Sequence, residues 1–268
     1  MKKKTKFWLS AVGLSLATLM PHHANAQAMP ACPEKNVMYW QAFPPGGESD
    51  LSARHQQVVL KKKCGAIDTI IQYKAGAGGG LMWAQMNNLP GDGLNVVGIN
   101  LPHIVFQPIE GEVQYKTADI TPVFWFHYTP DVLVVPESSP IKNFAEFIAA
   151  AKLSPGKMNL GGSGLNSANH AAHERLNAAF GIKSTYVPYK GGSQAVTDTV
   201  AGQTQVIMNG MLATLPHVQS GRLKVLGISK KTRMPLVGDV PTLAEQGVTD
   251  FESGTWQGAL VANGTPAA

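Results

Sequence analysis

The chain has 268 residues, of which 44% are hydrophobic and 28 are glycine, and its formal net charge is +5. This composition is typical of a globular α/β protein with many tight loops. The positive charge does not indicate nucleic-acid binding, because Lys2, Lys3, Lys4 and Lys6 lie in a leader segment without acidic residues. Without residues 1–26 the net charge is +1 (5 − 4).

The first 26 residues have the pattern of a signal peptide. The four lysines form a basic head, Phe7 to Met20 is an apolar run of 14 residues, and Ala24-Asn25-Ala26 supplies the small residues that precede cleavage. The run is too short to remain in a bilayer as an anchor. We therefore predict a soluble protein that is exported to the periplasm and cleaved near Ala26.

The two cysteines are predicted to form a disulfide. An oxidising compartment permits their pairing. Cys32 precedes a predicted strand and Cys64 ends the helix that follows, and in a βα unit the end of the helix returns to the start of the strand. Two buried free thiols are the alternative.

Short apolar runs alternate with helical segments, a pattern typical of an α/β fold with mostly parallel strands. The first series of predicted strands comprises Val37–Phe43, Ile67–Tyr73, Asn95–Asn100 and Val123–Tyr128, with helices at Leu51–Lys63 and Gly80–Asn88. The second series comprises Val132–Pro136, Met158–Gly162, Thr185–Tyr189, Val206–Met211 and Lys224–Ser229, and Gly258–Asn263 is the last predicted strand.

The clearest helix pattern covers Phe144–Lys152, where apolar residues recur every three or four positions. Asn143, followed three residues later by Glu146, resembles a capping box. Ser193 is predicted to cap another helix, which runs through Val200.

The two strand series predict two lobes. We expect lobe 1 to comprise residues 27–129 together with a return segment, 232–268, and lobe 2 to comprise residues 130–231. The chain is expected to cross between lobes near Thr129-Pro130 and again near Lys230–Arg233. Two crossings form a hinge, and a cleft between hinged lobes closes around ligands.

Four glycine-rich loops each follow a predicted strand and precede a predicted helix. They are residues 43–50, 76–80, 162–167 and 189–193. In open α/β sheets, ligands bind outside the carboxyl ends of the strands. Helix starts there expose N–H groups and a partial positive charge. A tight turn alone explains any one loop, but four loops in equivalent positions predict a carboxylate site.

Several segments resemble the receptors of tripartite tricarboxylate transporters, also called Bug proteins. They are Phe43-Pro-Pro-Gly-Gly-Glu-Ser-Asp50 with Ala53-Arg54, Ser139-Pro140 to Lys157, Val187-Pro-Tyr-Lys-Gly-Gly192, Leu215-Pro-His217 with Gly221-Arg-Leu223, Asp239-Val-Pro-Thr-Leu-Ala-Glu245, and Trp256-Gln-Gly258 with Gly264-Thr-Pro266. The resemblance implies a two-lobed periplasmic-binding-protein fold (type II, Venus flytrap), in which each lobe is a mixed, mostly parallel sheet flanked by helices.

The resemblance also implies that these loops hold one ligand carboxylate, partly through ordered water. The expected ligand-binding residues are Phe43, Pro45, Gly46, Gly47, Ser49, Ala77, Gly78, Gly79, Ser163, Gly164, Asn166, Ser167, Asn169, His170, Tyr189, Gly191, Gly192 and Asn209. Asn166 stands where the family commonly has glycine, and asparagine tolerates left-handed backbone angles. Family members continue past Pro266 with a helical segment, so we expect a truncated return segment and lower stability than in a longer relative.

Three other chemistries fit the sequence less well. Gly161-Gly-Ser163-Gly-Leu165 lacks the last glycine of a hydrolase nucleophile elbow, and residues 76–80 lack the third glycine of a dinucleotide fingerprint. His170 and His173, beside Glu174, lack the spacing and further ligands of a metal site. We expect His170 to brace its loop or face the ligand, and His173 to lie at the surface.

We therefore predict a monomeric receptor that is not an enzyme and binds no metal, cofactor or nucleic acid. It is expected to capture a di- or tricarboxylate or an aromatic acid for the membrane permease subunits of a tripartite tricarboxylate transporter. A periplasmic sensing subunit that passes its closed form to a two-component signalling system is the alternative. The sequence does not identify the acid.

Overall fold

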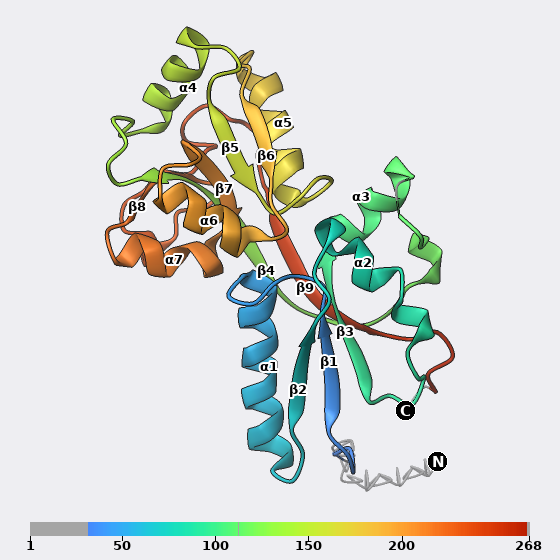
Figure 1. Cartoon of the computed structure of the whole chain (residues 1–268). Coiled ribbons are helices and arrows are strands. Elements are labelled where there is room, and N and C mark those ends of the chain that lie inside the picture. Colours follow the sequence, from blue (N-terminus) through green and yellow to red (C-terminus); the bar gives the residue numbers. More distant parts are fainter. Residues whose placement is uncertain (1–31, 112, 267–268) are drawn as a thin grey trace, which may run out of the picture. The chain divides into compact units, whose positions relative to one another are not determined.

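Two series of βα units build the fold, which the computed structural model describes for residues 32–111 and 113–266 (Figure 1). The first series contains β1 (Val37–Gln41), α1 (Glu48–Cys64), β2 (Thr69–Tyr73), α2 (Gly80–Trp83), β3 (Asn95–Leu101) and α3 (His103–Glu110). The second contains α4 (Phe144–Leu153), β5 (Asn159–Gly162), α5 (Ala168–Phe180), β6 (Thr185–Pro188), α6 (Gly192–Val200), β7 (Val206–Gly210), α7 (Met211–Gln219) and β8 (Leu223–Ile228). The predicted signal peptide lies outside the described residues.

Two strands, β4 (Thr121–Pro136) and β9 (Gly254–Val261), connect these series. In the first sheet, β1 pairs in parallel with β2 and β3, and β9 pairs antiparallel with β3 and with the first part of β4. In the second sheet, β5 pairs in parallel with β6 and β7, and the last part of β4 pairs antiparallel with β7 and β8. The predicted α/β fold with two mixed sheets is confirmed, and each antiparallel pair among the described strands contains β4 or β9.

The crossing between the halves differs from the predicted one in two ways. The sequence predicts two strands separated at Thr129-Pro130, but β4 runs through both sheets without a break, and Pro130 lies opposite Gly254. The chain also stays with the second half beyond Lys230–Arg233 and returns only in β9. The reason is the packing of Leu243, Val248 and Phe251 into the apolar core around α4 and α5.

Each half has its own apolar core. Trp83, Val97 and Ile99 belong to the core of the first half. In the second half, one core lies around Phe147 and Leu176, and another contains residues of β4, α6 and β7. Two cores supported by separate sheets favour relative motion of the halves at the strands that join them.

The start of α4 confirms Asn143 as the helix cap, but the return bond of the predicted capping box goes to the amide of Lys142 instead of Asn143. The Asn143 side chain accepts a hydrogen bond from the Glu146 amide at 2.9 Å, and the Glu146 carboxylate accepts one from the Lys142 amide at 2.7 Å. The bond to Asn143 satisfies a first-turn amide that the helix itself leaves without a partner.

Replacing Asn143 by alanine is expected to lower the free energy of unfolding by about 1 kcal/mol, because the first turn of α4 loses its side-chain acceptor. Urea unfolding measures the change. Lys142→Ala, at the exposed neighbouring position, is the control and should change stability by less than about 0.5 kcal/mol. Equal effects of the two substitutions would contradict the capping role.

Other element boundaries need correction. Ser193 does not cap α6, because the helix begins at Gly192 with Gly191 as its cap, which places Ser193 in the first turn. Helix α2 is only four residues long and is followed by a separate turn at Met86–Asn88, instead of one helix over Gly80–Asn88. The Cys32–Cys64 pairing stays a prediction. Among the described residues, no helix has the length and apolar character needed to span a membrane.

Candidate functional site

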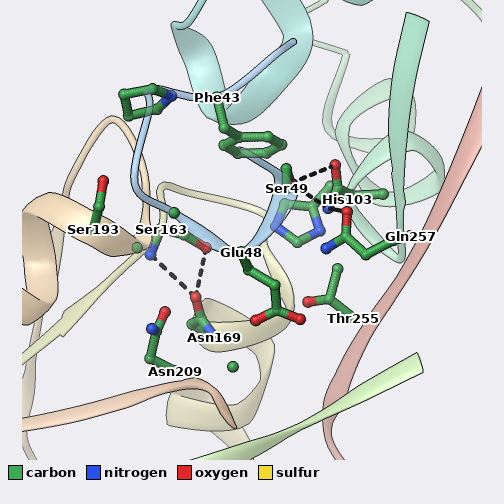
Figure 2. Close-up of a pocket in the computed structure, with 15 residues that line it drawn as sticks. Phe43, Glu48, Ser49, His103, Ser163, Asn169, Ser193, Asn209, Thr255 and Gln257 are labelled. Atoms are coloured by element: carbon green, nitrogen blue, oxygen red, sulfur yellow. Dashed lines mark hydrogen bonds between the residues drawn. The ribbon is translucent and has the colours of Figure 1, made fainter. Parts of the chain in front are cut away.

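A small cavity of about 30 Å³ lies where loops of the two halves meet (Figure 2). Its lining residues are Phe43, Pro44, Gly47, Glu48, Ser49, Asn100, His103, Ser163, Asn169, Gly192, Ser193, Asn209, Gly210, Thr255 and Gln257. The first half contributes the β1–α1 loop and the start of α3, and the second contributes the starts of α5 and α6 and the end of β7. In this conformation the cavity has room for one or two water molecules.

The N-termini of two helices, called helix starts below, supply main-chain hydrogen-bond donors to this cavity. Helix α1 begins at Glu48 after an extended Gly47, and no side chain caps it. Helix α6 begins at Gly192 after Gly191, again without a side-chain cap. The first amides of a helix have no partner within the helix and carry a partial positive charge. Two uncapped starts at one cavity therefore favour a negatively charged group.

Buried side chains of the first half hold its part of the lining in place. Asn100 donates to the Ser49 hydroxyl at 3.0 Å and to Gln257 Oε1 at 2.9 Å. The Gln41 side chain donates to the Ser49 carbonyl at 2.8 Å. Because these hydrogen bonds connect β1, α1, β3 and β9, the polar wall is preorganised by the sheet.

In the second half, a shorter chain of hydrogen bonds leads to the hinge strand β4. The Ser163 amide donates to Asn169 Oδ1 at 3.2 Å, and Asn169 Nδ2 donates to Asp131 Oδ1 at 3.2 Å. Ser253 Oγ donates to the other Asp131 oxygen at 2.6 Å. Burial raises the Asp131 pKa to about 6, although the hydrogen bonds from Ser253 and Asn169 lower it.

Glu48 is the acidic side chain in the lining. The residue is only partly covered, yet its Oε1 has no solvent contact. Burial raises the Glu48 pKa to about 8, Thr129 and Gln257 oppose the shift by hydrogen bonding, and the nearby Asp131 charge adds to it. Figure 2 shows the carboxyl group pointing into the cavity toward Thr255.

No lysine or arginine is among the described residues that line the cavity. His103 does line it, but burial lowers the His103 pKa to about 4, so the imidazole is neutral at pH 7. A bound anion would therefore depend on neutral donors and helix starts for its stabilisation.

Three polar atoms of the lining make no hydrogen bond of good geometry with the described residues. They are Glu48 Oε1, His103 Nδ1 and Gln257 Nε2. His103 and Gln257 are 2% and 3% exposed, respectively. An unsatisfied buried polar group costs about 1–3 kcal/mol, so a ligand or water that pairs with these atoms is favoured here.

The structure brings part of the predicted ligand set together. Phe43, Gly47, Ser49, Ser163, Asn169, Gly192 and Asn209 line the small cavity. Ala77, Gly78, Gly164, Asn166 and Tyr189 instead line a second cavity of about 300 Å³, together with Leu165 and Gln107. As predicted, Asn166 adopts a left-handed backbone, with φ of 54°.

The other predicted residues have different surroundings. Pro45 and Gly46 line a third hollow beside α6. Gly191 packs against Pro44, and Gly79 packs so closely against Trp83 that a Cβ there would lie 2.5 Å from the indole. Gly79 also has a left-handed backbone, with φ of 98°, so the tight-turn alternative explains this glycine.

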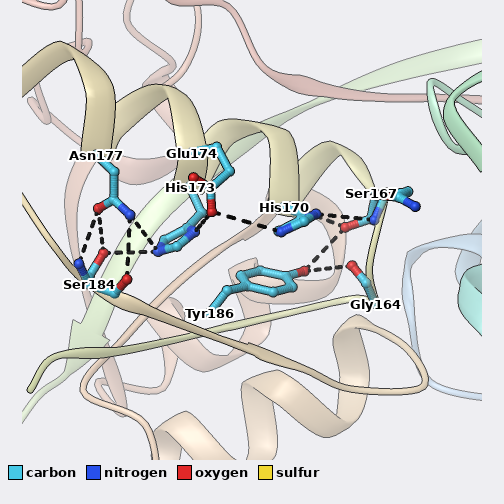
Figure 3. A network of polar contacts seen from close by, with 9 residues as sticks. Gly164, Ser167, His170, His173, Glu174, Asn177, Ser184 and Tyr186 are labelled. Carbon is cyan, nitrogen blue, oxygen red and sulfur yellow. Dashed lines mark hydrogen bonds and ion pairs between the residues drawn. The ribbon is translucent and has the colours of Figure 1, made fainter. Parts of the chain in front are cut away.

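Ser167 and His170 belong to a network that braces their loop (Figure 3). Ser167 is fully buried and accepts from the His170 amide at 3.1 Å, and so caps α5. His170 Nδ1 accepts from the Asn166 amide at 3.2 Å, and Tyr186 donates to the Gly164 carbonyl at 2.8 Å. These contacts agree with the bracing role expected of His170.

His173 is buried rather than at the surface. Its ring contacts Ser184 at 2.9 Å and Glu174 at 3.1 Å (Figure 3). In the part of the chain that the structure describes, no cluster of three or more histidine, cysteine, aspartate or glutamate side chains has the arrangement of a metal site.

Eight lining residues were absent from the predicted ligand set: Pro44, Glu48, Asn100, His103, Ser193, Gly210, Thr255 and Gln257. Pro44, Glu48 and Ser193 lie inside the glycine-rich loops, so including every loop residue would have found them. Asn100 and Gly210 lie at the carboxyl ends of strands, and His103 follows a strand. The rule that ligands bind at the carboxyl ends of strands therefore also applies to these three residues. Thr255 and Gln257 lie in β9, whose position depends on the long return of the chain.

Comparison with known proteins finds a matching family and several relatives. Residues 52–268 match the family model described as tripartite tricarboxylate transporter family receptor. A UPF0065 protein in the tcbD-tcbE intergenic region of Pseudomonas sp. is 30% identical over 96% of this chain and 76% of its own length.

Two solved structures have the same fold at similar identity. The R. palustris protein Rpa4515 with adipate has a TM-score of 0.82 and 27% identity, covering 88% of this chain and 79% of that one. MatC from Rhodopseudomonas palustris with bound malate has a TM-score of 0.79 and 26% identity, covering 87% of this chain and 80% of that one. Adipate and malate are both dicarboxylates.

Proposed function

Because the chain belongs to the family of tripartite tricarboxylate transporter receptors, we propose that it captures a small carboxylate in the cavity between its two halves. The observation that carries the proposal is the pair of uncapped helix starts, at Glu48 and Gly192, facing one cavity from opposite halves. Each start offers main-chain N–H groups to an anion. The structures of two relatives, one with adipate and one with bound malate, support this class of ligand.

Capture would proceed without bond-making chemistry. The ligand enters while the halves are apart, and closure surrounds its carboxylate with donors from both halves. Exclusion of water strengthens these charge-assisted hydrogen bonds. The ligand shifts the equilibrium toward closure by the difference between its affinities for the two forms.

We further propose that the protein is exported, with its leader cleaved near Ala26, and that its closed form delivers the ligand to permease subunits of a tripartite tricarboxylate transporter. The family membership supports this partner. The basic head and the short apolar run of the leader support export.

A thermal-shift screen against carboxylic acids tests the capture. An acid present at 100 times its Kd should stabilise the fold by about 2.7 kcal/mol, which appears as a rise in the melting temperature. The panel should contain dicarboxylates, tricarboxylates, aromatic acids and amino acids. If no acid raises the melting temperature, the proposed function is wrong.

Gly192→Ala should abolish the shift, because a Cβ at Gly192 would collide with Asn209 Oδ1 and push that side chain into the cavity. Lys152→Ala, at an exposed position of the same half, is the matched control and should keep the shift. A Gly192→Ala variant that keeps both its fold and the shift would place the ligand elsewhere.

A further inference from the structure

The side chain of Glu48 extends from the first half of the molecule to the second. It starts in the first turn of α1, and its carboxyl group lies against the end of β7, where the three atoms nearest to a Cβ placed on Gly210 all belong to Glu48. Hydrogen bonds with the Thr129 and Gln257 side chains connect the same carboxyl group to β4 and β9. Glu48 therefore contacts the second half and both strands that join the halves.

The carboxyl group is buried because the two halves meet around it. Its Oε1 has no solvent contact, although the residue as a whole is only partly covered. Figure 2 shows the group in the cavity that loops of both halves enclose. Separation of the halves would remove the wall that Gly210 forms and would admit water to the carboxyl group.

The surroundings favour the protonated form of Glu48 while the halves are closed. No described lysine or arginine lines the cavity, and His103 is neutral at pH 7. Burial raises the Tyr128 pKa to about 12, so this neighbour is neutral as well, whereas the Asp131 charge repels a second one. A buried carboxylate without a cation is costly, and burial accordingly raises the Glu48 pKa from 4.5 to about 8. Contact with water in an open form would return the pKa to its ordinary range.

We propose that closure of the two halves is linked to protonation of Glu48, which holds the closed form together when it is neutral and opposes closure when it is ionised. This inference goes beyond the proposed capture, because it concerns the protein without a ligand. Asp131 does not supply the same link. Its partners are Asn169 in the second half and Ser253 beside the start of β9, so opening leaves both hydrogen bonds in place.

The direction of the effect follows from the proton count. The closed form binds one more proton than the open form at any pH between the two pKa values of Glu48. Raising the pH therefore favours the open form, and the ratio of open to closed molecules should rise about tenfold for each pH unit in this window.

Small-angle X-ray scattering of the ligand-free protein at pH 5.5 and pH 8.5, at one ionic strength, tests the link. Wild-type protein should be compact at pH 5.5 and have a larger radius of gyration at pH 8.5, because the ratio of open to closed molecules rises about 100-fold or more over this range. Glu48→Gln keeps the shape of the side chain but does not ionise, so it should stay compact at both pH values. Gly210→Ala places a methyl group where the Glu48 carboxyl group lies, so it should have the larger radius at both.

Glu137→Gln is the control, because it removes one negative charge from an exposed position outside the cavity. It should respond to pH as the wild type does. The inference is overturned if the radius of the wild type is the same at both pH values, if folded Glu48→Gln expands as the wild type does, or if folded Gly210→Ala is as compact as the wild type at pH 5.5. Because no ligand is present, such a result leaves the proposed capture standing, and the thermal-shift screen tests that capture separately.

Discussion

Trp83→Ala is expected to lower the free energy of unfolding by about 3–5 kcal/mol, the range typical of removing a large buried aromatic side chain. Trp83 is fully buried, its indole donates to the Gly98 carbonyl at 2.9 Å, and its ring packs edge-on against Phe43 at 6.0 Å. The substitution leaves a cavity and removes the hydrogen bond to the Gly98 carbonyl. Urea unfolding measures the loss.

The same substitution should weaken ligand binding, because Phe43 lines the small cavity and would lose its support. Trp256→Ala is the control. Its ring is 48% exposed, so its removal should cost much less stability. A loss below about 1 kcal/mol for Trp83→Ala would mean that the core of the first half closes around the missing ring, contrary to expectation.

Stability is expected to fall by roughly 2 kcal/mol between pH 6.5 and 8, and Glu48→Gln should remove this decrease. The raised pKa of Glu48, about 8 against an ordinary value of 4.5, means that the folded state retains a proton which the unfolded state has already released. Raising the pH through this window therefore favours unfolding. Each tenfold change in proton affinity corresponds to about 1.4 kcal/mol.

Urea unfolding of wild type and Glu48→Gln across this window isolates the Glu48 contribution. Ionisation of Asp131, whose pKa is about 6, also destabilises the folded state as the pH rises, but mostly below this range. The histidines with lowered pKa values, including His103, act oppositely, and they too act mainly below pH 6.5. If the free energies of unfolding of the two proteins change in parallel with pH, Glu48 titrates as an exposed carboxyl does, contrary to this prediction.

The strands and the loops after them were predictable because they depend on local patterns. Short apolar runs bounded by glycine and proline located β1, β2, β3 and β5 within two residues at each end. The Asn143 cap was predictable for the same reason, since its partner Glu146 is three residues away. Placing the β1–α1 loop at the site needed only the rule that ligands bind at strand ends.

The remaining parts of the site depend on contacts between distant residues. Pro130 favoured the prediction of two separate strands, since proline lacks the N–H that strand pairing uses. In the structure it lies within β4, opposite Gly254. Asn100 and Gln257 are 157 residues apart but hydrogen-bonded, and no periodicity predicts such a pair. The burial of Glu48 likewise results from the approach of β7, so its raised pKa has no signal in the sequence.

The pairing of β4 with β9 has a mechanical consequence. Thr129 and Pro130 lie opposite Thr255 and Gly254, the Asp131 amide donates to the Ser253 carbonyl, and a Cβ at Gly254 would overlap the Thr129 carbonyl. Both connections between the halves thus form one tight ribbon, which acts as a single torsional joint and not as two independent tethers. Opening must twist both strands together, so the halves rotate about one axis and return to the same alignment after each cycle of release.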